Sequence, residues 1–182
     1  MWVVAGAPGA GKSTAADALR RRLRPVPALL DKDTLFAGLV AEILAASGRP
    51  YDEREGDWYD EHVKVHEYGG LTAAAAQIRA AGCPVLLVAP FTQQIRDPAA
   101  WERWVGRLGG EPVRLVWVRC DVPTLQGRIE ARGRRRDRAK LDAFAAFAAR
   151  VRPAEPPPVP HLVLDTSDGA TSLAAQLDAL LG

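Results

Sequence analysis

The chain has 182 residues, of which 48% are hydrophobic and 25% are charged, and its formal net charge is +2. This composition is typical of one globular domain with a sizeable core, and so small a charge does not indicate a nucleic-acid or membrane-surface partner. Cys83 and Cys120 are far apart and lack metal-ligand spacing, so we expect neither a disulfide framework nor a zinc site. The first apolar segment begins at residue 2, which leaves no room for a signal peptide, and no apolar run approaches the length of a membrane span. We therefore expect a single domain over residues 1–182, located in the cytoplasm.

Apolar segments and amphipathic segments alternate along the whole chain. Short apolar runs of the kind buried in parallel sheets predict strands at residues 2–5, 28–30, 84–89, 113–118 and 161–164. Apolar residues at helical spacing predict helices at 14–24, 35–46, 58–81, 98–108, 124–132, 141–151 and 170–181. Gly69-Gly70 could interrupt the helix at 58–81, and we expect loops at 51–57, 90–96 and 133–140.

Strands that alternate with helices predict an α/β fold, with a parallel sheet covered by helices on both faces and joined by right-handed crossovers. Ligands of such sheets bind beyond the carboxyl ends of the strands. The segments at those ends are residues 6–13, 31–33, 90–96, 119–121 and 165–167.

The first of these segments, Gly6-Ala7-Pro8-Gly9-Ala10-Gly11-Lys12-Ser13, fits the pattern G-x-x-x-x-G-K-[ST] of a phosphate-binding loop. The glycines let the backbone curl so that its N–H groups form a nest for an anion. Lys12 adds a charge for the β- and γ-phosphates, and Ser13 offers a hydroxyl to Mg²⁺. A strand precedes the loop and a helix follows from Thr14, as the motif requires, so we expect residues 6–14 to bind ATP.

Asp31 and Asp33 stand at the end of the second predicted strand. In a strand, residues i and i+2 point the same way, so both carboxylates could face the phosphate loop. One would hold Mg²⁺ through water, and the other would accept a proton from an attacking hydroxyl. The strand at 84–89 has no aspartate, which favours Asp31 for the Mg²⁺ role. The alternative is that Asp33 only caps the helix that follows it.

A third feature is a run of basic residues within residues 128–140, which we interpret as a lid. Arginines on a closing loop can neutralise the charge that develops on the γ-phosphate and can exclude water. A solvated basic surface and a patch for nucleic-acid phosphates are the alternatives. The run consists of Arg128, Arg132, Arg134, Arg135, Arg136, Arg138 and Lys140, and we place Arg128 in the ATP site.

These three segments together resemble those of the small P-loop kinases, which include chloramphenicol phosphotransferase, shikimate and gluconate kinases, the kinase domain of polynucleotide kinase, and zeta toxins. Within this group, the chain is most similar to the bacterial AAA-domain ATP-binding proteins related to polynucleotide kinase. The resemblance rests on residues 6–14, 31–33 and 118–140. It implies a five-stranded sheet in the order 2-3-1-4-5, with ATP and Mg²⁺ as cofactors.

The resemblance also implies roles for individual residues. Asp33 would be the general base, Asp31 would lie near Mg²⁺, and Arg132 and Arg136 match the lid positions that contact phosphate. Polynucleotide-kinase-like members often place an arginine three residues after the second aspartate, and here that position is Phe36. The departure argues against a phosphorylated or polynucleotide acceptor and favours an uncharged or partly apolar hydroxyl compound.

The acceptor pocket is the part of the site with the weakest sequence signal. Phe36 is one candidate for it, and the strand-end rule adds Phe91 and Arg96, which follow the third predicted strand. We expect His62 and His66 to be surface or core-edge residues, because the sequence around them lacks a metal-binding pattern.

Three functions are compatible with these residues. The first is an ATP-dependent kinase that phosphorylates a hydroxyl of an antibiotic, a nucleoside, a sugar or a cyclitol. The second is a polynucleotide or nucleotide-sugar kinase. The third is an ATP-driven switch that signals through a partner and has no small acceptor. Asp33 favours a kinase over a switch, because a switch needs no base for an acceptor hydroxyl.

Overall fold

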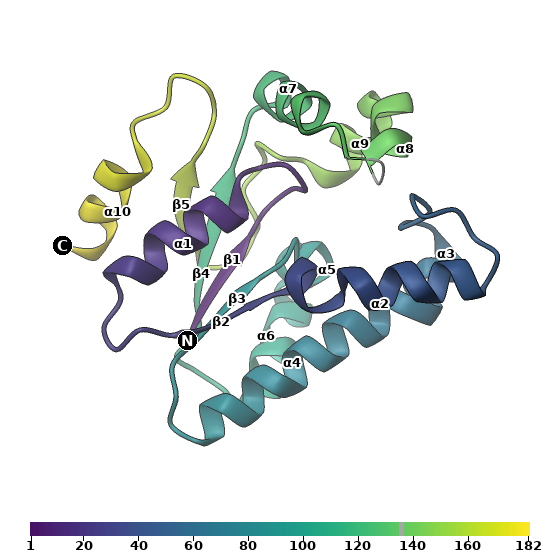
Figure 1. Cartoon of the computed structure of the whole chain (residues 1–182). Helices are drawn as coiled ribbons and strands as arrows, with labels where there is room; N and C mark the ends of the chain where they lie inside the picture. The colour runs from purple at the N-terminus through teal and green to yellow at the C-terminus, as the bar shows by residue number, and fades with distance from the viewer. Residues whose placement is uncertain (135–136) are drawn as a thin grey trace.

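The computed structural model describes residues 1–134 and 137–182, and the side chain of Ala139 is not described. Its centre is a five-stranded parallel sheet in the order β2-β3-β1-β4-β5, shown in Figure 1. This confirms the predicted fold class and strand order. The strands are β1 (Trp2–Ala5), β2 (Ala28–Asp31), β3 (Val85–Val88), β4 (Arg114–Arg119) and β5 (Leu162–Asp165).

The central strands are buried on both faces, which explains their continuous apolar sequences. Every residue of β3 is buried, as are Val3, Val4 and Ala5 of β1. The edge strands β2 and β5 are partly exposed, and each has an exposed apolar side chain, Leu29 and Val163.

Helices cover both faces of the sheet and make two separate cores, so the fold has three layers. On one face, Leu71 and Trp104 pack against Val3 and Leu87. On the other face, residues such as Leu19 of the first helix pack against the opposite side of β1 and β3. The helices are α1 (Lys12–Arg22), α2 (Lys32–Ala46), α3 (Asp57–Tyr59), the π-helical turn η1 (Asp60–Lys64), α4 (Val65–Ala80), α5 (Thr92–Ile95), α6 (Pro98–Arg107), α7 (Val122–Arg132), α8 (Arg138–Asp142), α9 (Phe144–Val151) and α10 (Leu173–Leu181).

Several predicted boundaries were wrong. Helix α2 begins at Lys32 rather than at residue 35, because the Asp31 side chain accepts hydrogen bonds from two N–H groups of the first turn and caps the helix. Helix α1 begins at Lys12, inside the phosphate loop. The Gly69-Gly70 pair does not interrupt α4, since the packing of an apolar face outweighs the weak helix propensity of glycine. The expected loops at 90–96 and 133–140 contain α5 and the start of α8, and α10 begins at Leu173.

The helices also frame the carboxyl edge of the sheet. In Figure 1, α2, α3 and α4 project beyond the sheet in one direction, and α7, α8 and α9 gather in another, with the β1–α1 loop seen between the two groups. No helix among the described residues combines the length and apolar character needed to cross a bilayer.

Candidate active site

The loop between β1 and α1 has the backbone of an anion-binding cradle. Gly6, Gly9 and Gly11 have φ values of +152°, +96° and +82°. Residues other than glycine rarely adopt such values. The loop is also packed closely: a Cβ on Gly6 would lie 2.5 Å from the Val118 carbonyl oxygen, and one on Gly9 would lie 2.9 Å from Ile129 Cγ1. The glycines therefore allow both the curl of the loop and its contact with β4 and α7.

Lys12 sits at the first position of α1, with its ammonium group turned back toward the loop. Its Nζ donates a hydrogen bond to the Ala7 carbonyl oxygen at 2.9 Å. Burial lowers the pKa of Lys12 to about 8, although Asp33 and Asp31 act in the opposite direction. A partly buried ammonium at the N-terminus of a helix is a site where an anionic phosphate group would be stabilised.

Asp31 uses its two carboxylate oxygens in different ways. Oδ1 accepts from the backbone N–H groups of Asp33 at 2.9 Å and Thr34 at 3.3 Å. Oδ2 accepts from the Ser13 hydroxyl at 3.1 Å. Ser13 and Asp31 thus offer hard oxygen atoms beside the phosphate cradle, which fits Mg²⁺. The described residues contain no group of three or more metal-binding side chains, but Mg²⁺ usually takes one or two protein ligands together with substrate phosphates and water.

Asp33 lies near Lys12, but not for the reason that the sequence suggested. It belongs to the first turn of α2 and not to the strand, so the i, i+2 argument was wrong. The cap of this helix is Asp31, which removes the capping explanation for Asp33. The Asp33 side chain is 47% exposed and lies 3.3 Å from the Lys32 ammonium, and its charge opposes the lowering of the Lys12 pKa. A carboxylate therefore lies near the Lys12 ammonium, beside the phosphate cradle.

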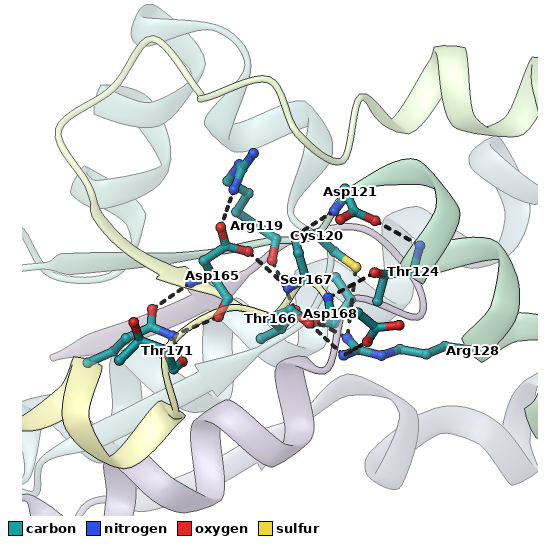
Figure 2. Close-up of polar contacts among 12 residues, drawn as sticks. Arg119, Cys120, Asp121, Thr124, Arg128, Asp165, Thr166, Ser167, Asp168 and Thr171 are labelled. Atoms are coloured by element: carbon teal, nitrogen blue, oxygen red, sulfur yellow. Dashed lines mark hydrogen bonds and ion pairs between the residues drawn. The ribbon is translucent and has the colours of Figure 1, made fainter.

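The opposite side of the cradle is closed by Arg128 and the β5–α10 loop (Figure 2). Arg128 donates to the Thr166 carbonyl oxygen at 2.5 Å and to its hydroxyl at 3.3 Å. The same hydroxyl lies 2.8 Å from the carbonyl oxygen of Ala10, within the phosphate loop. Arg128 also comes close to Gly11, so it lies beside the loop. From the sequence, residues 165–167 were recognisable only as a strand end, with no sign that Thr166 contacts the loop.

A network of loop contacts supports this arrangement in Figure 2. Asp121 accepts a hydrogen bond from Thr124 N–H at 2.7 Å and so caps α7, which holds its pKa below the usual range. Its own N–H donates to the Ser167 hydroxyl at 2.9 Å, and Arg119 forms an ion pair with Asp165. The ends of β4 and β5 are therefore held together beside the cradle.

Arg132 comes from the end of α7 and forms an ion pair with Asp137 at 2.7 Å. Asp137 is almost completely buried and also pairs with Lys140 at 3.0 Å. The positive charge of Arg132 contributes to lowering the Lys12 pKa, so this arginine is near the cradle. Arg136, the other predicted lid arginine, lies outside the described residues.

The three other residues predicted to contact an acceptor, Phe36, Phe91 and Arg96, all make contacts within the fold. Phe91 is fully buried between the rings of Tyr68 and Trp104, with centroid distances of 5.6 and 4.6 Å, so its side chain has no surface for a ligand. Phe36, on α2, is partly buried and packs against two of the hydrophobic clusters, one of which includes Leu71 of α4. Arg96 donates to the carbonyl oxygen of Arg152 at 2.9 Å and joins α5 to the chain after α9.

A buried polar cluster beside Asp33 was not predicted from the sequence. Glu67 of α4 is only 4% exposed, and it accepts a hydrogen bond from Lys32 Nζ and another from the Tyr59 hydroxyl, both at 2.7 Å. The sequence contained a signal for it, because Glu67 occupies a helical stripe that is otherwise apolar, four residues after Val63 and four before Leu71. His62 and His66 are exposed, as expected.

The fold and the loop together define a P-loop protein with the topology of the small kinases. Residues 1–154 match the model of the AAA domain family, AAA_33, and the chain belongs to that family. No curated protein matches the chain.

Solved structures with a similar fold come from several kinases and a resistance protein. The tunicamycin resistance protein of Deinococcus radiodurans is 19% identical with a TM-score of 0.59, covering 100% of this chain and 95% of that chain. A gluconokinase from Sinorhizobium meliloti is 19% identical with a TM-score of 0.56, covering 98% and 91%. The APS kinase of Mycobacterium tuberculosis, solved with AMPPNP and APS, is 19% identical with a TM-score of 0.53, covering 99% and 94%. These similarities establish the fold of this chain.

Proposed function

We propose that the protein is an ATP-dependent kinase that transfers the γ-phosphate of ATP to a hydroxyl group of a small molecule. The observation that carries the proposal is the position of Asp33, whose half-exposed carboxylate lies near Lys12 and two residues from the Asp31–Ser13 pair. A switch would need the cradle and Mg²⁺, but it would not need a carboxylate on the acceptor side.

Each residue has a distinct role in this reaction. The loop amides and Lys12 bind the phosphates, and Ser13 and Asp31 would hold Mg²⁺, which neutralises phosphate charge when bound. The acceptor hydroxyl attacks the γ-phosphorus, its proton passes to Asp33, and the bond to the β-phosphate oxygen breaks to release ADP. Arg132 stabilises the charge on the transferring group once it leaves Asp137.

The charges around Asp33 support an uncharged acceptor. The Lys32 ammonium lies 3.3 Å from Asp33 and is shared between two carboxylates, Asp33 and Glu67. The position where related kinases place a phosphate-binding arginine holds Phe36, which packs into the core. The charge of Lys32 is therefore already balanced by two carboxylates, whereas an antibiotic, nucleoside, sugar or cyclitol hydroxyl would meet a carboxylate base.

Among the similar structures, the gluconokinase and the APS kinase are kinases of small molecules by name, which agrees with this proposal. The alternative, a polynucleotide kinase, is not favoured by the net charge of +2. We expect the phosphate acceptor to be a small molecule, and we expect no specific binding of nucleic acid.

The test is release of ADP from Mg-ATP with a panel of acceptors: chloramphenicol, uridine, D-gluconate, D-glucose, myo-inositol and a 5′-hydroxyl oligonucleotide. We expect at least one small hydroxyl compound to raise turnover above the rate with water. Asp33→Asn should lower kcat by roughly 10²- to 10⁴-fold, the usual contribution of a general base, with little change in Mg-ATP affinity.

Other outcomes have clear meanings. If only the oligonucleotide raised the release of ADP, the result would favour a polynucleotide kinase. ATP binding with no stimulation by any compound, and with equal turnover for wild type and Asp33→Asn, would favour the switch.

A further inference from the structure

The buried cluster beside Asp33 links α2 to two helices that come later in the chain, α3 and α4. Tyr59 of α3 donates to Glu67 Oε2 and Lys32 of α2 donates to Glu67 Oε1, each at 2.7 Å. The Lys32 ammonium lies 3.3 Å from Asp33 Oδ1 and 5.9 Å from the centre of the Tyr68 ring. The contacts therefore run in a chain from Tyr59 through Glu67 and Lys32 to Asp33.

The burial of Glu67 makes this chain different from an ordinary surface ion pair. A buried carboxylate is stable only when it is paired and hydrogen-bonded, and Glu67 has one partner on each oxygen. The Lys32 side chain is itself only 13% exposed. Lys32 is thus held at its inner side by a fixed anion, and it presents its charge to Asp33 from a defined position.

Asp33 is the member of the cluster that needs such support. Its side chain is 47% exposed, so water competes for the contacts that its oxygens make. A general base must lie within hydrogen-bond reach of the proton that it removes. An error of about 1 Å in the position of a reacting group can lower the rate by roughly 100-fold.

We propose that Lys32, anchored by Glu67 and Tyr59, is a positioning residue that holds the Asp33 carboxylate in its orientation toward the phosphate cradle. This role rests on the proposed kinase function, because Asp33 acts as a base only in that reaction. It also assigns Glu67, a buried acid on α4, a function beyond the stability of the fold.

The experiment is a double-mutant cycle on kcat, with the best acceptor of the panel or with water as the acceptor. Lys32→Met should lower kcat by roughly 10- to 100-fold with Mg-ATP affinity unchanged, and Lys32→Arg should restore most of the rate. In the Asp33→Asn background, Lys32→Met should have almost no further effect, because a residue that acts through Asp33 has nothing left to position. Glu67→Gln, which keeps the size of the side chain, provides a second cycle if Lys32→Met fails to fold.

Lys64→Met is the matched control, because Lys64 forms a similar lysine–carboxylate pair with Asp60 at 2.9 Å, on η1. It should leave kcat unchanged. Full activity of Lys32→Met, or an equal loss in both Asp33 backgrounds, would overturn the positioning role and leave the kinase proposal intact. If the wild type turns over no ATP with any acceptor or with water, the proposed function fails and the positioning role fails with it.

Discussion

The Ser13 hydroxyl donates a hydrogen bond to Asp31 Oδ2 at 3.1 Å, which joins the first turn of α1 to the start of α2. The other oxygen of Asp31 caps α2 through Asp33 N–H. A single carboxylate thus connects the candidate Mg²⁺ ligand, the phosphate loop and the helix that carries the proposed base.

These two roles of Asp31 can be separated by substitution. Asp31→Asn should keep the cap, because asparagine caps helices as well as aspartate does, but the Mg²⁺ concentration for half-maximal turnover should rise by about 10-fold or more. Asp31→Ala should show the same Mg²⁺ effect and also lose about 1 kcal/mol of unfolding free energy. Mg²⁺ titration of turnover and chemical denaturation measure the two effects, and an unchanged Mg²⁺ requirement in both variants would remove Asp31 from the metal site.

Lys12→Ala should weaken Mg-ATP binding. Loss of a hydrogen bond to a charged group corresponds to roughly 1.5–3 kcal/mol, which is about 10- to 100-fold in the dissociation constant. Calorimetric titration with Mg-ATP provides the measurement, with Lys64→Ala as a control lysine outside the cradle. Equal affinity of Lys12→Ala and wild type would contradict the assignment of the loop.

Arg132→Ala should affect turnover far more than ATP affinity. An arginine that meets charge mainly in the transition state can contribute about 10³-fold or more to kcat. Arg103→Ala is the control, since Arg103 is an exposed arginine on α6 and is not part of the basic run. If Arg132→Ala turns over ATP at the wild-type rate and only its melting temperature falls, the arginine serves the ion pair with Asp137 alone.

Gly6→Ala should destabilise the fold. The new Cβ would meet the Val118 carbonyl oxygen at 2.5 Å, and φ is +152°, so we expect a loss of about 2 kcal/mol or more in the free energy of unfolding. Gly38→Ala is the control, because Gly38 lies on the exposed side of α2 and its Cβ would meet nothing within 4 Å. This substitution should raise the free energy of unfolding by about 0.5–1 kcal/mol, because alanine favours a helix more than glycine does. Urea denaturation of both variants tests the difference, and equal stability would show that the loop can move away from β4.

Local sequence patterns were sufficient to predict the sheet and the phosphate loop. Each predicted strand forms within one residue of its expected bounds, because a short apolar run between turn residues has few alternatives in a parallel sheet. The loop from Gly6 to Ser13 was recognisable because its chemistry depends on backbone freedom and two side chains at fixed spacing. Arg128 lies beside that loop, and its role in ATP binding stays a prediction.

The limits of the sequence are clearest at Asp31 and Asp33. Their spacing predicted two carboxylates on one strand face, but the strand ends at Asp31 and the helix begins at once. The helix begins there because Asp31 caps it, which is a local interaction. An aspartate can also occur in a loop or at the end of a strand, so the position of Asp31 in the sequence did not decide where the helix begins. Phe91 shows a second limit, because the residue after a strand can point into the core as readily as toward a ligand, and here it is fully buried.

The sequence by itself determined the class of fold, the phosphate cradle and the presence of carboxylates at the end of β2, because all of these follow from short-range patterns. Only the tertiary structure decided that Thr166 contacts the cradle and that Glu67 anchors Lys32 beside Asp33. Lys32 and Glu67 are 35 residues apart, and no pattern of period two or 3.6 reports on such a pair. Their contact depends on how α4 packs against α2, and side-chain packing between distant elements is settled only when the whole core has formed.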